Sequence, residues 1–312
     1  MSRPEPAAGR SAPASDERSE NPLAYRRRAA AVLDVSGPDA ADFLQGQVTQ
    51  DVRGMTAGEV RPAAGLTPKG KLLYVARVLA LPDRLRLLLP ATLRVPVRDH
   101  LSKYAAFQKA VIEDRSEDFL RLGLYAAPPL ETGAGRDWIP LPGEGEFAAE
   151  ILVSSSEGRA IGPVLRDAGF REIDAESAEA LRVQAGRPRY GQDFDGSHLP
   201  DEVGLAEAIS TTKGCYVGQE IVARLRTYGR VNRRLVGFRF SEGSVAPGAV
   251  LRPETDEGPS KVEWGRVTSA VRSPRFGPIG LGFAFREVEL GARLMTRDVP
   301  TRGAVVAALP FR

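Results

Sequence analysis

The chain has 312 residues, of which 43 are Lys or Arg and 40 are Asp or Glu, so its net charge is +3. This length exceeds what one hydrophobic core usually supports, and two or three modules are therefore expected. Apolar residues make up 42% and charged residues 27%, which is ordinary for a soluble globular protein. The small net charge does not mark a nucleic-acid binder, and no run approaches the roughly 18 apolar residues that a membrane span needs.

Residues 1–22 form a stretch rich in Pro, Ala, Ser and charged residues. They contain no apolar run of the kind found in a secretory signal, and their acidic residues argue against an organellar transit peptide. Such a composition predicts a disordered tail. The single cysteine of the chain excludes an intramolecular disulfide, which fits a reducing compartment, and we expect a cytoplasmic protein.

The first module is predicted to start with a strand that leads into a helix. Residues 30–35 have the pattern of a strand, and Ser36-Gly37-Pro38-Asp39 then provides a cap-like residue and an early proline for a helix over residues 40–47. The elements expected next are a hairpin of residues 72–81 and 84–89 that turns at Pro82-Asp83, a helix over residues 91–105 and a strand over residues 111–114. These predict an antiparallel sheet.

The second half of the chain changes from mixed elements to short strands. Strands alternate with Gly- and Pro-rich loops from residue 119 to residue 153, and helices are expected over residues 160–169 and 174–185, the latter stopped by Gly186. Beyond Arg234 the β-rich pieces are residues 235–240, 249–252, 262–271, 279–285 and 304–309. Their spacing predicts a small, closed or nearly closed barrel, with a domain boundary near residue 235.

The only cysteine lies in an eight-residue motif, Lys213–Glu220 (KGCYVGQE). The residues after it have the pattern of a helix that ends near Gly229, so the amides around Cys215 should lie at or just before the positive end of a helix dipole, which stabilises a thiolate. Lys213 adds a cationic neighbour. An inert thiol in a packed turn is the alternative, and the local residues favour neither interpretation.

Longer motifs surround this one. They are residues 186–194 (GRPRYGQDF), 199–210 (LPDEVGLAEAIS), 211–225 (TTKGCYVGQEIVARL) and 228–237 (YGRVNRRLVG), with residues 43–52 (FLQGQVTQDV) and 68–71 (PKGK) nearer the start. In this order they resemble the YgfZ family of folate-binding proteins, relatives of the aminomethyltransferase (T-protein) of glycine cleavage. The resemblance leaves out only about the first two dozen residues, and the cysteine separates this branch from the aminomethyltransferases.

The resemblance implies an α+β, aminomethyltransferase-like folate-binding fold. Two α+β modules, residues 23–234, and a C-terminal β-barrel, residues 235–312, would surround a central hole that receives tetrahydrofolate or a one-carbon derivative. The implied role is that of a folate-dependent accessory protein for the assembly or repair of iron-sulfur enzymes, with indirect effects on tRNA modification. Iron-sulfur client enzymes would then be its protein partners.

The same resemblance implies roles for individual residues. Glu202 matches the position credited with holding the pterin edge. A carboxylate suits this role because it can accept two charge-assisted hydrogen bonds from the pterin. Asp201, the neighbouring residue, is the alternative candidate for this contact. Arg224 is assigned to a tail carboxylate. The remaining expectations are Tyr190, Tyr216 and Gln219 as folate-binding residues and Cys215 and Lys213 as catalytic residues. Either tyrosine could equally be a core residue.

One departure from the aminomethyltransferases bears on activity. Their catalytic acidic pair follows a glycine turn, and aligning Lys69-Gly70 with this turn places Leu73 and Tyr74 at the acidic positions. Neither side chain can act as a carboxylate. The absence of the acidic pair therefore argues against aminomethyl transfer of the usual kind. A tetrahydrofolate-dependent aminomethyl or methyl transferase is the alternative hypothesis, and it would need Glu220 or Asp193 as a replacement base.

A tRNA-binding module is a further alternative, because residues 224–234 hold five arginines. The low net charge and the lack of a known RNA-binding signature do not favour direct nucleic-acid binding. His100 and His198 have no metal-ligand spacing with Cys215, so no zinc site is predicted. One cysteine cannot hold a four-cysteine cluster, and any contact with an iron-sulfur cluster would be transient or shared between chains.

Overall fold

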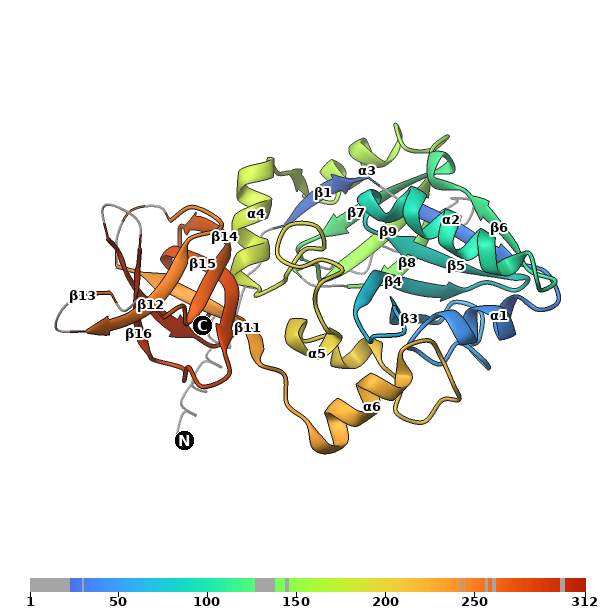
Figure 1. Ribbon diagram of the computed structural model, residues 1–312. Helices are drawn as coiled ribbons and strands as arrows, with labels where there is room; N and C mark the ends of the chain where they lie inside the picture. The colour runs from blue at the N-terminus through green and yellow to red at the C-terminus, as the bar shows by residue number, and fades with distance from the viewer. Residues whose placement is uncertain are drawn as a thin grey trace, which may run out of the picture.

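The computed structural model describes residues 23–29, 31–126, 138–143, 146–241, 243, 245–255, 258–259, 262–297 and 301–312. The expected disordered tail, residues 1–22, lies outside these residues. Figure 1 shows a larger part that contains the helices and a smaller all-β part beside it, with helix α4 where the two meet. None of the described helices is long and apolar enough to cross a membrane.

The first module is an antiparallel sheet covered by two helices. The strands, in sheet order, are β3 (Val60–Leu66), β4 (Leu72–Ala80), β5 (Arg84–Leu89), β2 (Ala31–Ser36) and β6 (Val111–Asp114). The hairpin predicted at Pro82-Asp83 is the β4–β5 pair. Helices α1 (Ala40–Gln47) and α2 (Arg94–Ala105), the latter preceded by the short helix η1 (Ala91–Leu93), bury Phe43, Leu44 and Leu101 in the core of this module.

The second module repeats this design with a mixed sheet. Its strands, in sheet order, are β10 (Arg171–Glu172), β1 (Ala24–Arg28), β7 (Phe119–Leu124), β9 (Ala149–Ser154) and β8 (Trp138–Pro142), and the short helix η2 (Ser116–Asp118) precedes β7. Helix α3 (Ile161–Asp167) packs on this sheet. One apolar cluster joins the two sheets, because it contains Val32 and Leu88 of the first and Leu152 of the second.

Helix α4 (Ala175–Gln184) follows the start and stop signals of its sequence. The carboxylate of Asp174 accepts a hydrogen bond from the Ser177 amide at 2.7 Å and so caps the first turn. Gly186 then takes φ of +68°, the left-handed conformation that ends many helices. An added Cβ at Gly186 would lie 2.8 Å from the Cβ of Leu309, so this end of the helix also packs closely on the C-terminal segment.

The C-terminal part is a closed β-barrel. Its strands are β11 (Arg233–Phe240), β12 (Val250–Thr255), β13 (Gly258–Pro259), β14 (Gly265–Ser273), β15 (Gly277–Phe285), β16 (Arg293–Thr296) and β17 (Gly303–Ala307). They pair in the order β13-β12-β14-β15-β11-β17-β16, and the pairing of β12 with β16 closes the ring. Phe238, Leu251 and Val267 lie in its core. The first barrel strand begins at Arg233, close to residue 235, where the composition changes.

Two short helices and one longer helix connect the modules to the barrel. These are α5 (Pro200–Val203), η3 (Ala206–Ala208) and α6 (Gln219–Tyr228). Figure 1 shows α5 and α6 below the first sheet, on the path that leads into β11. The loop of residues 213–220, which carries the lone cysteine, therefore lies between the second module and the barrel in the chain path.

Candidate functional site

Cys215 lies in the loop that leads into α6, and its thiol is free and exposed. The helix begins at Gln219 and is capped at Gly229, as the sequence predicts. Gly218 is the N-cap residue with φ of +83°, a conformation that favours glycine. The cysteine is therefore accessible and lies just before the positive end of a ten-residue helix.

Lys213 is held in place by backbone carbonyls. Its Nζ donates hydrogen bonds to the carbonyl oxygens of Gln45, Val48 and Gln50 at 2.6, 2.7 and 2.9 Å, which use all three ammonium donors. These carbonyls lie at and just beyond the C-terminal end of α1, where a cation is favourable. Burial lowers the pKa of Lys213 to about 8. The contacts give Lys213 an anchoring role for the loop, and its expected catalytic role stays a prediction.

The loop also packs closely on the turn between β3 and β4. A Cβ added at Gly218 would lie 2.5 Å from the carbonyl oxygen of Thr67, and one added at Gly70 would lie 2.8 Å from Ile221. The amide of Val217 donates to the carbonyl of Gly46 at 3.3 Å. The close approach of the Ile221 side chain at Gly70 and of the Thr67 backbone at Gly218, together with φ values of +71° and +83°, explains why glycine is needed at both positions. Residues 68–71 and 213–220, far apart in the sequence, form one surface.

Glu202 is buried, with 6% of its surface exposed, at the end of the one-turn helix α5. Its Oε2 accepts a hydrogen bond from the Leu199 amide at 2.9 Å, and its Oε1 accepts one from Nε of Arg233 at 3.1 Å. Asp201 next to it is partly exposed and pairs with Arg226 at 3.4 Å. Glu202 is thus a fixed carboxylate in the interior, and the neighbouring Asp201 is the solvated one.

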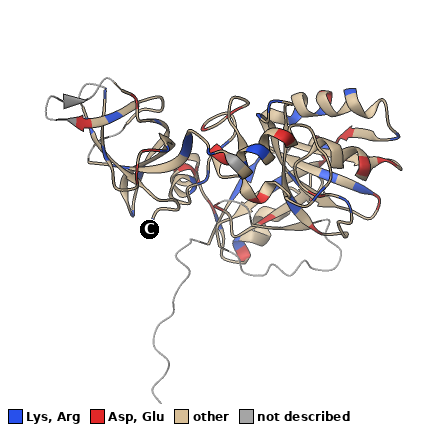
Figure 2. Cartoon of the chain, turned by 60° about the horizontal axis from the view of Figure 1, so that its bottom comes forward, with Lys and Arg blue, Asp and Glu red and all other residues tan. Residues whose placement is uncertain are grey.

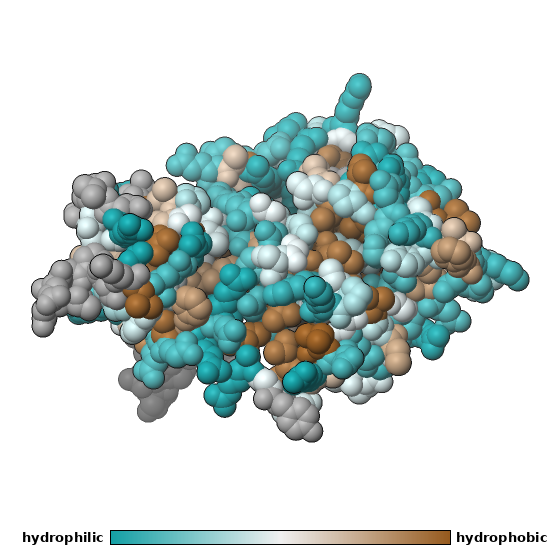
Figure 3. Space-filling view, in the orientation of Figure 1, coloured by the Kyte–Doolittle hydropathy of each residue, from teal (hydrophilic) through white to brown (hydrophobic). Residues whose placement is uncertain are grey.

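Five rings from three parts of the chain meet beside Glu202. We call this cluster, Tyr190, Phe194, His198, Tyr216 and Phe283, the aromatic junction. Ring centroids lie 5.4 Å apart for Tyr190 and Phe194, 6.5 Å for Phe194 and His198, and 4.7 Å for His198 and Phe283. Tyr216 shares the apolar cluster of Phe194 and Phe283. In Figure 3, apolar side chains gather on the surface over α5, which carries Glu202.

The junction is linked to its carboxylate and to the cysteine loop. The guanidinium of Arg233, which pairs with Glu202, lies 5.4 Å from the ring centroid of Phe283. The ammonium of Lys213 lies 5.1 Å from the ring of Tyr216. Burial raises the pKa of Tyr216. The structure therefore brings together the expected residues Tyr190, Tyr216 and Glu202, and it adds Arg233 and the barrel residue Phe283, which the sequence patterns did not indicate.

Two other expected residues, Gln219 and Arg224, lie on α6 and are not members of the aromatic junction. Gln219 begins α6, and its amide donates to the Tyr216 carbonyl at 3.2 Å. Arg224 is exposed on α6. The structure describes no direct contact that joins Arg224 or Cys215 to Glu202. Their shared membership of a folate site stays a prediction.

The arginine run is divided among structural contacts. Arg233 pairs with Glu202, Arg226 pairs with Asp201, and Arg234 donates to the carbonyls of Arg286 and Val288. Figure 2 shows basic and acidic residues interspersed along the described chain. Three of the five arginines are therefore engaged by other groups of the protein, and Arg224 and Arg230 are exposed.

Leu73 and Tyr74, which the sequence resemblance aligns with the acidic pair, both lie on β4 next to the site. Tyr74 is buried and donates from its hydroxyl to the carbonyl of Gln47 at 3.2 Å, and burial raises its pKa. The hydroxyl of Tyr190 donates to the carbonyl of Leu73, also at 3.2 Å. The hairpin therefore reaches the aromatic junction, but at this point it presents an apolar side chain and a phenol.

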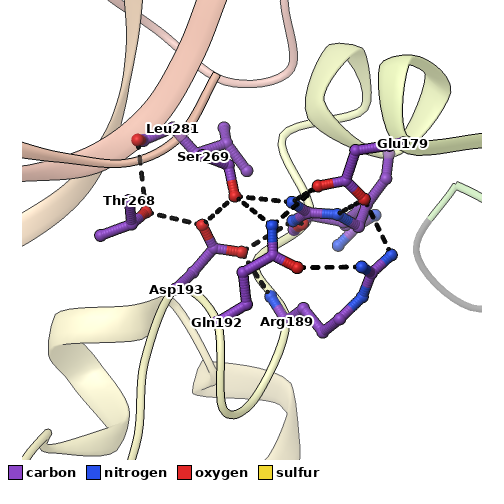
Figure 4. Close-up of polar contacts among 9 residues, drawn as sticks. Glu179, Arg189, Gln192, Asp193, Thr268, Ser269 and Leu281 are labelled. Carbon is purple, nitrogen blue, oxygen red and sulfur yellow. Dashed lines mark hydrogen bonds and ion pairs between the residues drawn. The ribbon is translucent and has the colours of Figure 1, made fainter. Parts of the chain in front are cut away.

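Asp193, one of the two replacement bases considered, is fully engaged elsewhere. It is buried and accepts hydrogen bonds from Arg182, the Arg189 amide, Thr268 and Ser269, at 2.8, 2.8, 2.6 and 2.6 Å. Figure 4 shows this network between the loop after α4 and barrel strand β14. Asp193 thus fastens the barrel to the second module. Glu220, the other candidate, is exposed at the start of α6.

Two cavities in the described structure lie elsewhere. One is lined by residues of β1, α4 and the loop after α4, and the other by residues around η2, β8 and the end of β9. Neither is lined by Cys215, Glu202 or Arg224. Among the described residues, no group of three or more His, Cys, Asp or Glu side chains is arranged to hold a metal ion.

The fold defines the structural class. The chain matches the glycine cleavage system aminomethyltransferase T of Bartonella henselae with a TM-score of 0.80 over 93% of this chain and 86% of that one, at 21% identity. The predicted α+β, aminomethyltransferase-like fold with a C-terminal β-barrel is thereby confirmed.

Sequence relatives give the narrower grouping. The chain is 29% identical to the tRNA-modifying protein YgfZ of Klebsiella pneumoniae over 78% of this chain and 79% of that protein. It is 28% identical to the protein of the same name from Edwardsiella ictaluri over 89% of both. A putative chloroplastic transferase of Arabidopsis thaliana is 26% identical over 89% of this chain and 68% of its own length. No family model matches. The resemblance to the YgfZ family that the motifs predicted is confirmed by these relatives.

Proposed function

We propose that the protein binds a reduced folate, tetrahydrofolate or a one-carbon derivative, at the aromatic junction. In this proposal it serves as a folate-dependent accessory protein in the assembly or repair of iron-sulfur enzymes, through which it affects tRNA modification. The observation that carries the proposal is the arrangement of a buried carboxylate, Glu202, beside aromatic rings from both the larger part and the barrel.

The chemistry of a pterin matches this arrangement. A pterin is flat and carries hydrogen-bond donors along one edge, so a binding site needs aromatic surface and a fixed carboxylate. Each oxygen of Glu202 accepts one hydrogen bond from the protein, and a carboxylate has about four acceptor positions. Arg233 and the Leu199 amide hold the carboxylate in place and leave acceptor capacity for a ligand. Arg224 on α6 is assigned to the glutamyl carboxylates.

The exposed thiol supplies the second half of the proposal. Cys215 precedes the positive end of α6 and is anchored through Lys213 to the end of α1. A thiolate is the form that binds iron, and a single thiolate on the surface can contact a cluster held by another protein. The name that the relatives carry, tRNA-modifying protein, agrees with an indirect role in tRNA modification.

A one-carbon transferase is less well supported. Transfer of a one-carbon unit needs a general acid or base near the folate nitrogens. Leu73 and Tyr74 stand at the acidic positions of the aminomethyltransferases, and the carboxylate of Asp193 is occupied by four donors.

Calorimetry of 5-formyl-tetrahydrofolate binding tests the folate proposal. Glu202→Gln keeps an oxygen for the Leu199 amide but removes the charge, and we expect it to weaken binding about 10-fold or more, because hydrogen bonds to a charged group are the strong ones. Asp201→Asn is the matched control and should leave affinity nearly unchanged. Absence of binding by the wild-type protein, or equal losses in both variants, would contradict the proposal.

The role of the thiol is tested separately. Cys215→Ala should leave folate affinity nearly intact and abolish function in a cell-based assay of iron-sulfur enzymes. A loss of folate affinity in Cys215→Ala would make the cysteine part of the pocket wall, and full activity of this variant in cells would remove the thiol from the mechanism.

A further inference from the structure

A cavity of about 320 Å³ lies between β1, the segment after β7, helix α4 and the loop after α4. We call it the arginine cavity; the residues that matter below are Arg26, Arg28, Tyr125, Glu146, Glu179 and Arg189. Its volume is at the lower end of the range for small-molecule sites. It shares no lining residue with the aromatic junction or with the loop of residues 213–220.

The buried hydroxyl of Tyr125 is the first evidence that this cavity binds a ligand. The residue is 1% exposed, and its hydroxyl oxygen is buried and has no hydrogen-bond partner within the described structure. Its ring packs at 4.9 Å, centroid to centroid, on Phe147, which also lines the cavity. A buried hydroxyl without a partner costs folding free energy, so such groups in native proteins call for an explanation. A molecule in the cavity that accepts this hydroxyl hydrogen would supply one.

Three guanidinium groups surround the same space with unused donors. Arg26 donates to the Asp174 carbonyl at 2.8 Å, and Arg28 donates to Glu150 at 2.9 Å. Arg189 contacts Gln192 at 2.9 Å and Glu179 at 3.0 Å. Each guanidinium has five N–H groups, of which these contacts use one or two. Ala175, the first residue of α4, also lines the cavity. The positive end of the α4 dipole therefore lies beside the cavity.

The polar network of Figure 4 fixes one wall. Glu179 is held by Arg182 at 2.6 and 3.0 Å, and Gln192 donates to Ser269 at 2.9 Å. Burial alone would raise the pKa of Glu179, but the hydrogen bonds and charge of Arg182 outweigh it and lower this pKa to about 2. Arg189, which contacts both Glu179 and Gln192, is therefore positioned before any ligand arrives.

Glu146 is the group that opposes an anion. Burial raises its pKa, although Arg28, Arg182 and Arg189 lower it. The lining holds three arginines and two glutamates, one excess positive charge, and protonation of Glu146 would add a second. The net charge of the lining therefore favours binding of an anion. The protonation state of Glu146 determines how large this net positive charge is.

We propose that the arginine cavity binds a small molecule through a phosphate group, which accepts hydrogen bonds from the Tyr125 hydroxyl and from Arg26, Arg28 and Arg189. Four donor groups from three segments, β1, the residue after β7 and the loop after α4, match the three or four oxygens of a phosphate better than the two oxygens of a carboxylate. This site is separate from the proposed folate site and does not depend on it.

The test is calorimetry of inorganic phosphate binding to the full-length protein, in buffers matched in ionic strength with chloride. Arg26→Gln should weaken binding about 10-fold or more, as expected for loss of a charged donor. Glu146→Gln should strengthen binding, because it removes the competing carboxylate. Arg98→Gln is the matched control, since Arg98 pairs only with its neighbour Asp99 on the surface in the described contacts, and it should change nothing.

Tyr125→Phe provides the sharpest outcome. It removes a hydroxyl that has no partner without phosphate, so the ligand-free variant should melt no lower than wild type, whereas phosphate affinity should fall severalfold. Failure of wild type to bind phosphate at millimolar concentration, equal binding of acetate, or a clear drop in the melting temperature of ligand-free Tyr125→Phe would each overturn the proposal. Loss of 5-formyl-tetrahydrofolate binding in Arg26→Gln would show that the cavity is part of the folate site and not a separate one.

Discussion

Removal of the Asp193 carboxylate should uncouple the barrel from the rest of the protein. Asp193 is 3% exposed and accepts four hydrogen bonds, two of them from Thr268 and Ser269 on β14. Loss of one partner of a buried ion pair typically costs 3–5 kcal/mol. Arg182 would keep its contacts with Glu179. We therefore expect Asp193→Ala to lower the free energy of unfolding by about 3 kcal/mol, the low end of this range. Asp193→Asn keeps one acceptor oxygen and should cost about half as much.

The two tryptophans of the chain provide the assay. Trp138 lies in the sheet of the second module, and Trp264 lies just before β14 in the barrel. Urea unfolding is followed in two backgrounds, each of which keeps one of the two tryptophans. With Asp193 intact, the Trp138 and Trp264 transitions should coincide. With Asp193→Ala, the Trp264 transition should occur at a lower urea concentration than the Trp138 transition. A loss below about 1 kcal/mol, within the range of an ordinary surface contact, would refute the view that this network joins the two parts.

Three further predictions concern the cysteine loop. Gly218→Ala should destabilise the protein by more than about 1 kcal/mol in urea unfolding, because φ is +83° and the Thr67 oxygen lies 2.5 Å from the added Cβ; an unchanged midpoint would contradict this close approach. Burial lowers the pKa of Lys213 from 10.5 to about 8, so between these pH values the unfolded chain binds more protons, and wild type should gain stability relative to Lys213→Met as pH rises. A difference in unfolding free energy that stays flat from pH 8 to pH 10 would exclude this titration. The thiol of Cys215 should react with a thiol reagent in the folded protein about as fast as in urea, because it is exposed; strong protection in the folded state would show that it is covered.

Local sequence signals predicted the regular elements well where they act within a few residues. The Asp174 cap and the Gly186 stop bracket α4, Gly229 caps α6, and the turn at Pro82-Asp83 joins β4 to β5. Strand β16, with only four residues, was not predicted, although its pairing with β12 closes the barrel. Short strands carry too little periodic signal to be found from the sequence.

The motifs of the chain determined, by themselves, the family resemblance, the fold class that follows from it and the candidate residues. Only the tertiary structure decided their contacts: Glu202 pairs with Arg233 across 31 positions, Lys213 reaches Gln45 across 168, and Asp193 reaches Ser269 across 76. The physical reason is that helix ends and turns are set by hydrogen bonds between near neighbours, whereas buried polar groups must find partners wherever the packing of distant segments places them.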